Sequence, residues 1–430
     1  MGAILIEQIK DVLGSLGIEL YCIVESVQES IECFFIRKKL DLKRGTDLTD
    51  YSVTVFCPFE KDGQKMLGSS VLNLHPGMEV EELKEVLQKA YEAAALVCNP
   101  YYELNKGTKE EAVLADSTFA GKSLEENTKQ MVAALYEADV FEDTFINSAE
   151  IFATHTVRHI VNACAVDVSY ETYQVSGEYV VQCTTPQDVE TYHTFSYRDA
   201  NVQTLRKEVE EAITITRERA KAQNPPKAGD YTILLSGKHI NTLLRYYVER
   251  SKTGMVYQKF SNYEIDALVQ GQEIQKDALT MYLKAKEPYS AEGIPMKDRL
   301  LLQDGTLKTL HGGIRFASYL GVEPTGEYSS IEVMAGSQTV EELKASPYLY
   351  IASFSDFQMD EFSGYFGGEI RLAFLYDGKS VTPVTGGSIN GSILEAQKHM
   401  TFSKELYCCE QYEGPYMVRI ENVAVAGLQE

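Results

Sequence analysis

The pair Pro225-Pro226, directly after Asn224, is the strongest break in the sequence. A helix expected over residues 201–222 must end before it, because proline cannot continue a helix. At 430 residues the chain is long enough for two or three domains that each bury a core. We predict three regions: an N-terminal α+β region over 1–105, a middle region over 106–223 packed with it, and a C-terminal domain over 226–430.

The part before the break combines two kinds of hydrophobic period. Apolar residues at helical spacing predict helices over 4–16, 81–98, 124–138 and 201–222. Alternation typical of strands marks 32–40, 51–59 and, most extensively, 149–199. We therefore expect an α+β fold in which an α/β-type N-terminal domain with a mixed sheet comes first.

The part after the break is mainly strand-like. An apolar strand is expected over 231–235 and a helix over 238–252. Residues 299–311 and 371–383 each read as a strand, an Asp-Gly turn and a second strand, which is the pattern of a hairpin with a tight primed turn. We predict a strand-rich C-terminal domain with few helices.

Charge and cysteine usage exclude several functions. The 63 acidic and 40 basic residues give a formal net charge of −23, and such a surface repels the phosphates of DNA and RNA. The N-terminus lacks the pattern of a signal peptide or a myristoylation site, and no apolar run is long enough to span a membrane. Eight scattered cysteines without a CxxC pair indicate the reduced thiols of a cytoplasmic protein. From the charge and the lack of a long apolar run we expect no binding to nucleic acid or membrane.

Histidine spacing gives little support for a metal site. None of the seven histidines is followed by glutamate, so a motif that begins His-Glu is absent. His155 and His159 share one face of a strand or helix, and Cys164 is near in sequence. A solvent-facing pair is the favoured interpretation, because three zinc ligands are not assured; a metal site at His155, His159 and Cys164 is kept as an alternative.

Two further features were weighed for chemistry. Cys408 and Cys409, with His399 upstream, suggest a thiol nucleophile, but adjacent strand residues point to opposite faces, so buried structural cysteines are favoured. Two glycine-rich segments predict hairpin bends or a backbone that a ligand approaches closely. Their candidate peptide-groove residues are Gly364, Gly367, Gly368, Gly386 and Gly387.

The C-terminal half resembles the TldD/PmbA family. Residues 293–321 contain a Gly-x-Pro, an apolar strand, an Asp-Gly-x-Leu turn and an Ala-x-x-Leu-Gly helix end, followed by Pro-Thr-Gly at 324–326. Residues 383–400 and 414–427 are similar to the closing segments of the family, and 161–181 to its middle region. The resemblance implies a bacterial cytoplasmic peptidase system, formerly labelled a modulator of DNA gyrase.

The family contains two kinds of subunit. The TldD kind carries a His-Glu-x-x-x-His helix that binds zinc, and the PmbA kind, also called TldE, lacks it and acts as the partner. Placing the family's strand on 231–235 puts the two histidine positions on Arg245 and Arg250 and the glutamate on Tyr246. Arginines repel a divalent cation, so the resemblance implies a chain without zinc of its own.

These observations predict a non-catalytic PmbA-type subunit that binds or positions an extended peptide. We expect a homodimer, or a heterodimer with a TldD-type subunit that carries the zinc. Two alternatives remain: an active peptidase with an unrecognised metal site, and a non-proteolytic binding protein that regulates another enzyme.

Overall fold

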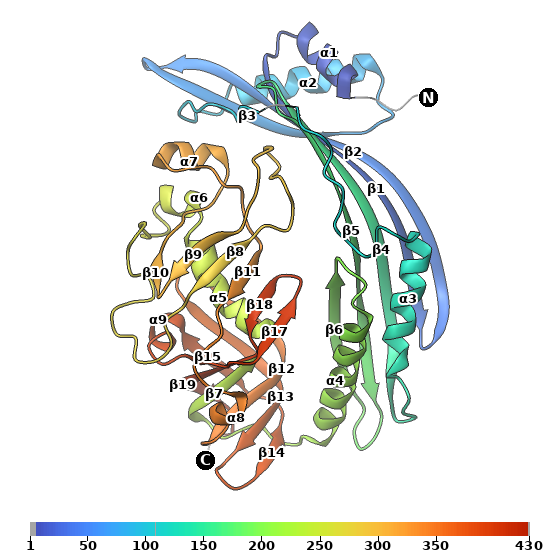
Figure 1. The fold of residues 1–430 in the computed structure, drawn as a ribbon, viewed down its shortest axis with the longest axis vertical. Helices are drawn as coiled ribbons and strands as arrows, with labels where there is room; N and C mark the ends of the chain where they lie inside the picture. Colours follow the sequence, from blue (N-terminus) through green and yellow to red (C-terminus); the bar gives the residue numbers. More distant parts are fainter. Residues whose placement is uncertain (1–5, 108, 429–430) are drawn as a thin grey trace.

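The strands that precede the proline pair form one long, curved sheet (Figure 1). The computed structural model describes residues 6–107 and 109–428. The strand order is β3-β2-β1-β4-β5-β6. Its members are β1 Leu20–Ile36, β2 Lys39–Lys61, β3 Gln64–Leu74, β4 Thr144–Asn162, β5 Asp167–Cys183 and β6 Val189–Tyr197. Because β1 pairs with both β2 and β4, the regions on either side of residue 105 share this sheet.

Each pairing in the sheet is antiparallel, whereas the sequence led us to expect a mixed sheet. The physical reason is the length of the connections. Turns of a few residues join β1 to β2, β2 to β3 and β4 to β5, and parallel neighbours need a crossover of a dozen or more residues. The α+β class and the strand-rich C-terminal part are confirmed.

Four helices cover one face of this sheet in two pairs. The first pair, α1 Ile6–Ser15 and α2 Val80–Ala94, packs around Val161 of β4. The second pair, α3 Leu124–Glu137 and α4 Val202–Lys221, packs around Ile151 of the same strand. Ile151 and Val161 are an even number of positions apart, so they point to the same face. The expected boundaries agree with the structure to within a few residues; residues 4–5 of the first expected helix lie outside the described residues.

The C-terminal domain contains two further sheets. One has the order β10-β9-β8-β11-β18-β17, and the other the order β12-β7-β19-β15-β13-β14, with β16 beside β19. An additional pairing of β12 with β13 closes β12, β7, β19, β15 and β13 into a ring. The strands are β7 Gly229–Ser236, β8 Met281–Lys284, β9 Arg299–Gln303, β10 Thr306–Leu307, β11 Ser330–Val333, β12 Tyr348–Met359, β13 Tyr365–Tyr376, β14 Val381–Val384, β15 Ser388–Ser392, β16 Thr401–Phe402, β17 Leu406–Cys409, β18 Tyr412–Pro415 and β19 Met417–Ala426.

Helix α5, Lys238–Arg250, runs through the core of this domain (Figure 1). Its apolar residues share one buried cluster with strands of both C-terminal sheets. Tyr246 and Arg250 are also buried, so the helix is enclosed on more sides than its single apolar stripe predicted. The other helices are α6 Thr253–Tyr257, α7 Ile314–Leu320, α8 Val340–Leu343 and α9 Ile393–Ala396.

The two expected hairpins are present, but only the first has the tight turn. Asp304 and Gly305 both have positive φ, which a two-residue primed turn requires, and they join β9 to β10. The second hairpin pairs Tyr376 with Val381, so four residues form its loop. The eight cysteines are free thiols. In the described chain no helix has the length and apolar character needed to cross a membrane.

The strands of the ring pack so closely at Gly368 that a larger residue there should destabilise the fold. A Cβ atom at Gly368 of β13 would lie 2.4 Å from the Asp356 carbonyl oxygen of β12. We expect Gly368→Ala to lower the free energy of unfolding by about 1–3 kcal/mol, because the paired backbone must move. Urea denaturation measures the loss. Gly121→Ala is the matched control, since nothing lies within 4 Å of a Cβ there; equal effects of both variants would contradict the packing account.

Candidate functional site

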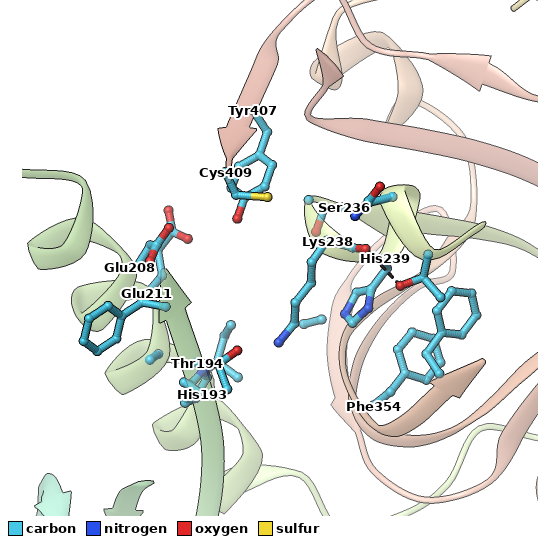
Figure 2. A pocket seen from close by; sticks show the side chains of 18 of the residues that line it. His193, Thr194, Glu208, Glu211, Ser236, Lys238, His239, Phe354, Tyr407 and Cys409 are labelled. Atoms are coloured by element: carbon cyan, nitrogen blue, oxygen red, sulfur yellow. Dashed lines mark hydrogen bonds between the residues drawn. The ribbon is translucent and has the colours of Figure 1, made fainter. Parts of the chain in front are cut away.

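A cavity of about 640 Å³ lies between the long sheet and the C-terminal domain (Figure 2). On the N-terminal side it is lined by β6 and α4. On the C-terminal side it is lined by the junction of β7 with α5, by β12 and by β17. Its volume falls in the range of ligand-binding clefts, which often form where two domains meet.

The N-terminal wall of the cavity is the free edge of a sheet. β6 is the last strand in its sheet and pairs only with β5 among the described strands. Residues 193–197, five in succession, line the cavity. Successive side chains of a strand point to opposite faces, so a cavity lined by all five wraps around the strand edge. Backbone N–H and C=O groups of β6 are therefore available there.

The first turn of α5 forms part of the opposite wall. Ser236 ends β7, and Gly237, with a φ of 55°, turns the chain into the helix. Lys238 extends into the cavity beside His239 (Figure 2). Burial and the neighbouring Lys238 lower the pKa of His239 to about 3, so its imidazole is neutral. Burial also lowers the pKa of Lys238 itself.

Two carboxylates of α4 line the N-terminal side of the cavity. Glu208 accepts a hydrogen bond of 2.5 Å from the Tyr197 hydroxyl. Burial raises the pKa of Glu208 and of Glu211, and repulsion between the two adds to the effect at Glu208. Both groups therefore hold a proton more readily than exposed glutamates do.

Cys409 and His193 also line the cavity. Burial raises the pKa of the Cys409 thiol, which makes it a weak nucleophile at neutral pH. Burial and Lys238 lower the pKa of His193 to about 4, and its ring stacks on Tyr179. The cavity thus offers hydrogen-bond donors, acceptors and aromatic surface, a set suited to binding.

The other end of α5 carries Arg245, Tyr246 and Arg250, which the sequence analysis predicts at the positions of the family's metal helix. The Arg250 guanidinium donates hydrogen bonds to three backbone carbonyl oxygens at 3.3–3.4 Å and to Asn262 at 3.1 Å. The rings of Tyr246 and Tyr263 lie 5.3 Å from it. Arg245 pairs with Glu249 at 2.7 Å. A guanidinium held in this way cannot ligate zinc, so these residues do not fit a zinc ion.

His155 and His159 each contact a carboxylate of the neighbouring strand β5. His155 lies 2.8 Å from Glu171, and His159 lies 2.7 Å from Asp167. Cys164 is in the turn between β4 and β5, where its backbone N–H donates to the Asn162 side chain. Within residues 6–107 and 109–428, no three His, Cys, Asp or Glu side chains gather as a group that could hold a metal ion.

The five candidate groove glycines do not themselves line the cavity, although Gly368 pairs with Phe357 of β12, which does. Gly367 and Gly368 belong to β13, Gly364 precedes it, and Gly386 and Gly387 precede β15. None is among the residues that line the cavity, and neither is His399 or Cys408. The peptide-groove role of these glycines stays a prediction.

Sequence reasoning missed most of the cavity. Only Cys409 had been weighed as a functional residue, and it was interpreted as structural. Lys238 and Glu208 lie 30 positions apart, on helices of different domains, and no period or motif links them. The one local signal was the polar pair Lys238-His239 directly after a buried strand and a glycine.

Comparison with known proteins gives a family and a fold. Residues 228–427 match the model of the PmbA/TldA metallopeptidase C-terminal domain. A search of curated proteins found no match.

Solved structures share the architecture over nearly the whole chain. A proposed modulator of a DNA gyrase from Thermotoga maritima has a TM-score of 0.77 at 16% identity, with 98% of this chain and 100% of that chain covered. TldE from Thermococcus kodakarensis has a TM-score of 0.75 at 17% identity, with the same coverage. A proposed modulator of DNA gyrase from Bacteroides thetaiotaomicron has a TM-score of 0.77 at 15% identity, with 98% of each chain covered. The C-terminal domain, residues 228–427, therefore belongs to the TldD/PmbA family, and the fold of the whole chain is the one that these solved structures share.

Proposed function

We propose that this protein is a non-catalytic, PmbA-type subunit that binds an extended peptide. The observation that carries the proposal is the free edge of β6 inside the cavity between the two domains. An extended peptide can add to such an edge as a further strand, with main-chain hydrogen bonds supplying affinity that depends little on sequence. Opposite it, residues 354–357 of β12 supply aromatic surface and a serine to the same space.

The residues of α5 support a non-catalytic role. Two arginines and a tyrosine stand where the TldD kind of subunit carries His, His and Glu, and Arg250 is fixed among backbone carbonyls. Zinc would then reside in a TldD-type partner. The alternative of a metal site at His155, His159 and Cys164 has less support, because both histidines already face carboxylates of β5. No specific contact in the described chain favours the interpretation as a non-proteolytic protein that regulates another enzyme.

Peptide backbone chemistry tests strand addition. The probe is a short, unstructured, fluorescently labelled peptide, and N-methylation at alternate residues removes the N–H groups along one of its edges. We expect at least one of the two alternate methylation registers to weaken binding about tenfold or more, because several main-chain hydrogen bonds are lost. Fluorescence anisotropy measures the affinity. Full affinity of both methylated peptides would contradict strand addition. A peptide of scrambled sequence is the control, and we expect its affinity to be unchanged.

We also propose that the protein pairs with a second copy of itself through β2. Residues 39–50 of β2 pair with β1, but no described strand pairs with their other edge. Leu40, Leu42 and Leu48 on this segment are 45%, 49% and 51% exposed. A long open edge with exposed apolar side chains is a template for pairing with another chain.

The sequence of this edge is self-complementary. In a two-fold antiparallel pair, facing residues must belong to the same face, so their numbers differ by an even amount. A two-fold axis at Gly45 places Leu42 opposite Leu48, and Lys43 opposite Asp47. Apolar and opposite-charge pairs of this kind stabilise sheets.

Charge exchange tests the predicted register. We expect Lys43→Asp and Asp47→Lys each to weaken the dimer, because like charges then face each other, and the double variant to restore it. Sedimentation velocity measures the dimer fraction at low salt. Asp41→Lys is the matched control, since Asp41 faces Thr49 in this register. A monomeric protein, or single variants that dimerise normally, would refute the pairing; association only with a TldD-type subunit would replace it with a heterodimer.

A cytoplasmic location completes the proposal. All eight cysteines are free thiols, which suits a reducing compartment.

A further inference from the structure

Lys238 is a cation without a counter-ion in the cavity. Its side chain extends from the first residue of α5 into the open space (Figure 2). Of the carboxylates in the described chain, none lies within 4.0 Å of its ammonium group. Glu208 acts on it only at longer range, through charge. A lysine that reaches into a cleft without a partner is a ready ligand for an anion.

His239, next to it, is a buried donor without a protein partner. It is only 9% exposed, and it lines the cavity beside Lys238. Its ring makes edge contacts with Phe354 and Phe357, at centroid distances of 4.9 and 5.7 Å. No residue of the described chain forms a hydrogen bond with its ring nitrogens. These nitrogens are not among the fully buried atoms that lack a partner, so they open to the cavity. A neutral imidazole offers one N–H and one acceptor nitrogen to a ligand there.

The backbone adds to these two side chains. The residue before the helix is Gly237, and no side chain caps α5. The Gly237 N–H donates to the Tyr416 carbonyl oxygen and the Ile240 N–H to that of Gly237, which leaves the N–H groups of Lys238 and His239 without an acceptor in the described chain. N–H groups at the start of a helix carry partial positive charge. Residues 236–239 all line the cavity, so this end of the helix opens into it.

The acidic groups around the cavity do not fill this position. Glu410 contacts Arg198 at 3.5 Å, and Glu208 is bonded to the Tyr197 hydroxyl. Burial raises the pKa values of Glu208 and Glu211, which weakens their negative charge. Asp356 also lines the cavity, and its side chain accepts a hydrogen bond from Gln358.

We propose that the start of α5 binds a carboxylate of the peptide held in the cavity, through the Lys238 ammonium, the His239 ring and the first N–H groups of the helix. The inference rests on the proposed peptide binding and adds a chemical preference to it. Main-chain pairing with β6 would hold the peptide, and the carboxylate would fix its position along the strand. The carboxylate comes either from the peptide's C-terminus or from an acidic side chain.

Three forms of one probe peptide separate these sources. The first has a free C-terminus and no acidic residue, the second has an amidated C-terminus, and the third is amidated with one internal aspartate. We expect a carboxylate form to bind about tenfold or more tighter than the amidated form, because charge-assisted hydrogen bonds are strong. Tighter binding of the first form would identify the C-terminal carboxylate as the ligand, and tighter binding of the third form would identify the aspartate side chain.

Substitution of the lysine tests the site itself. Lys238→Gln should abolish the difference in affinity between the carboxylate form and the amidated form. Lys238→Arg should keep most of the gain, and Lys379→Gln, on an exposed turn, should keep all of it. Equal binding of all three forms, or equal weakening of all three by Lys238→Gln, overturns the carboxylate site and leaves strand addition standing. Binding of none of the forms overturns both.

Discussion

The enclosure of α5 between the two C-terminal sheets is the constraint on which the candidate site depends. Its apolar residues anchor a core that joins strands of both sheets, so neither end of the helix can move independently. One end opens at the interdomain cavity with Lys238 and His239, and the other ends at the buried Arg250. One rigid element therefore sets both part of the cavity lining and the positions of Arg245, Tyr246 and Arg250.

The long sheet supplies the second half of the site through its edge. β6 is the last strand of the sheet, and α4 packs beside it with two glutamates facing the cavity. An open edge in solution invites aggregation, and here the C-terminal domain covers it while leaving a cavity of about 640 Å³. The proposed binding of an extended peptide rests on this covered edge with free space beside it.

Sequence patterns predicted the parts of the fold whose signals are local. The helix predicted over 124–138 is α3, and its start is fixed locally by Ser123, which forms a capping box with Glu126. The hairpin at Asp304 followed from its turn residues. The great length of β2 was missed, since residues 41–50 are exposed on an open edge and need no alternation of apolar side chains.

The site was harder to predict because tertiary contacts assemble it. Arg245, Tyr246 and Arg250 were singled out from the sequence, but two of the three carbonyl oxygens that hold Arg250 come from residues 361–362, more than a hundred positions along the chain. The cavity depends on the docking of two domains, which no local pattern encodes. The polar pair Lys238-His239 after a buried strand was the only feature of the sequence that pointed to the cavity.

The zinc content and hydrolytic activity of the purified protein test the central claim most directly. Metal analysis by mass spectrometry after gel filtration in zinc-containing buffer, together with an assay of peptide cleavage, should find peptide binding without stoichiometric zinc and without cleavage. One tightly held zinc ion per chain, accompanied by cleavage of the bound peptide, would contradict the account.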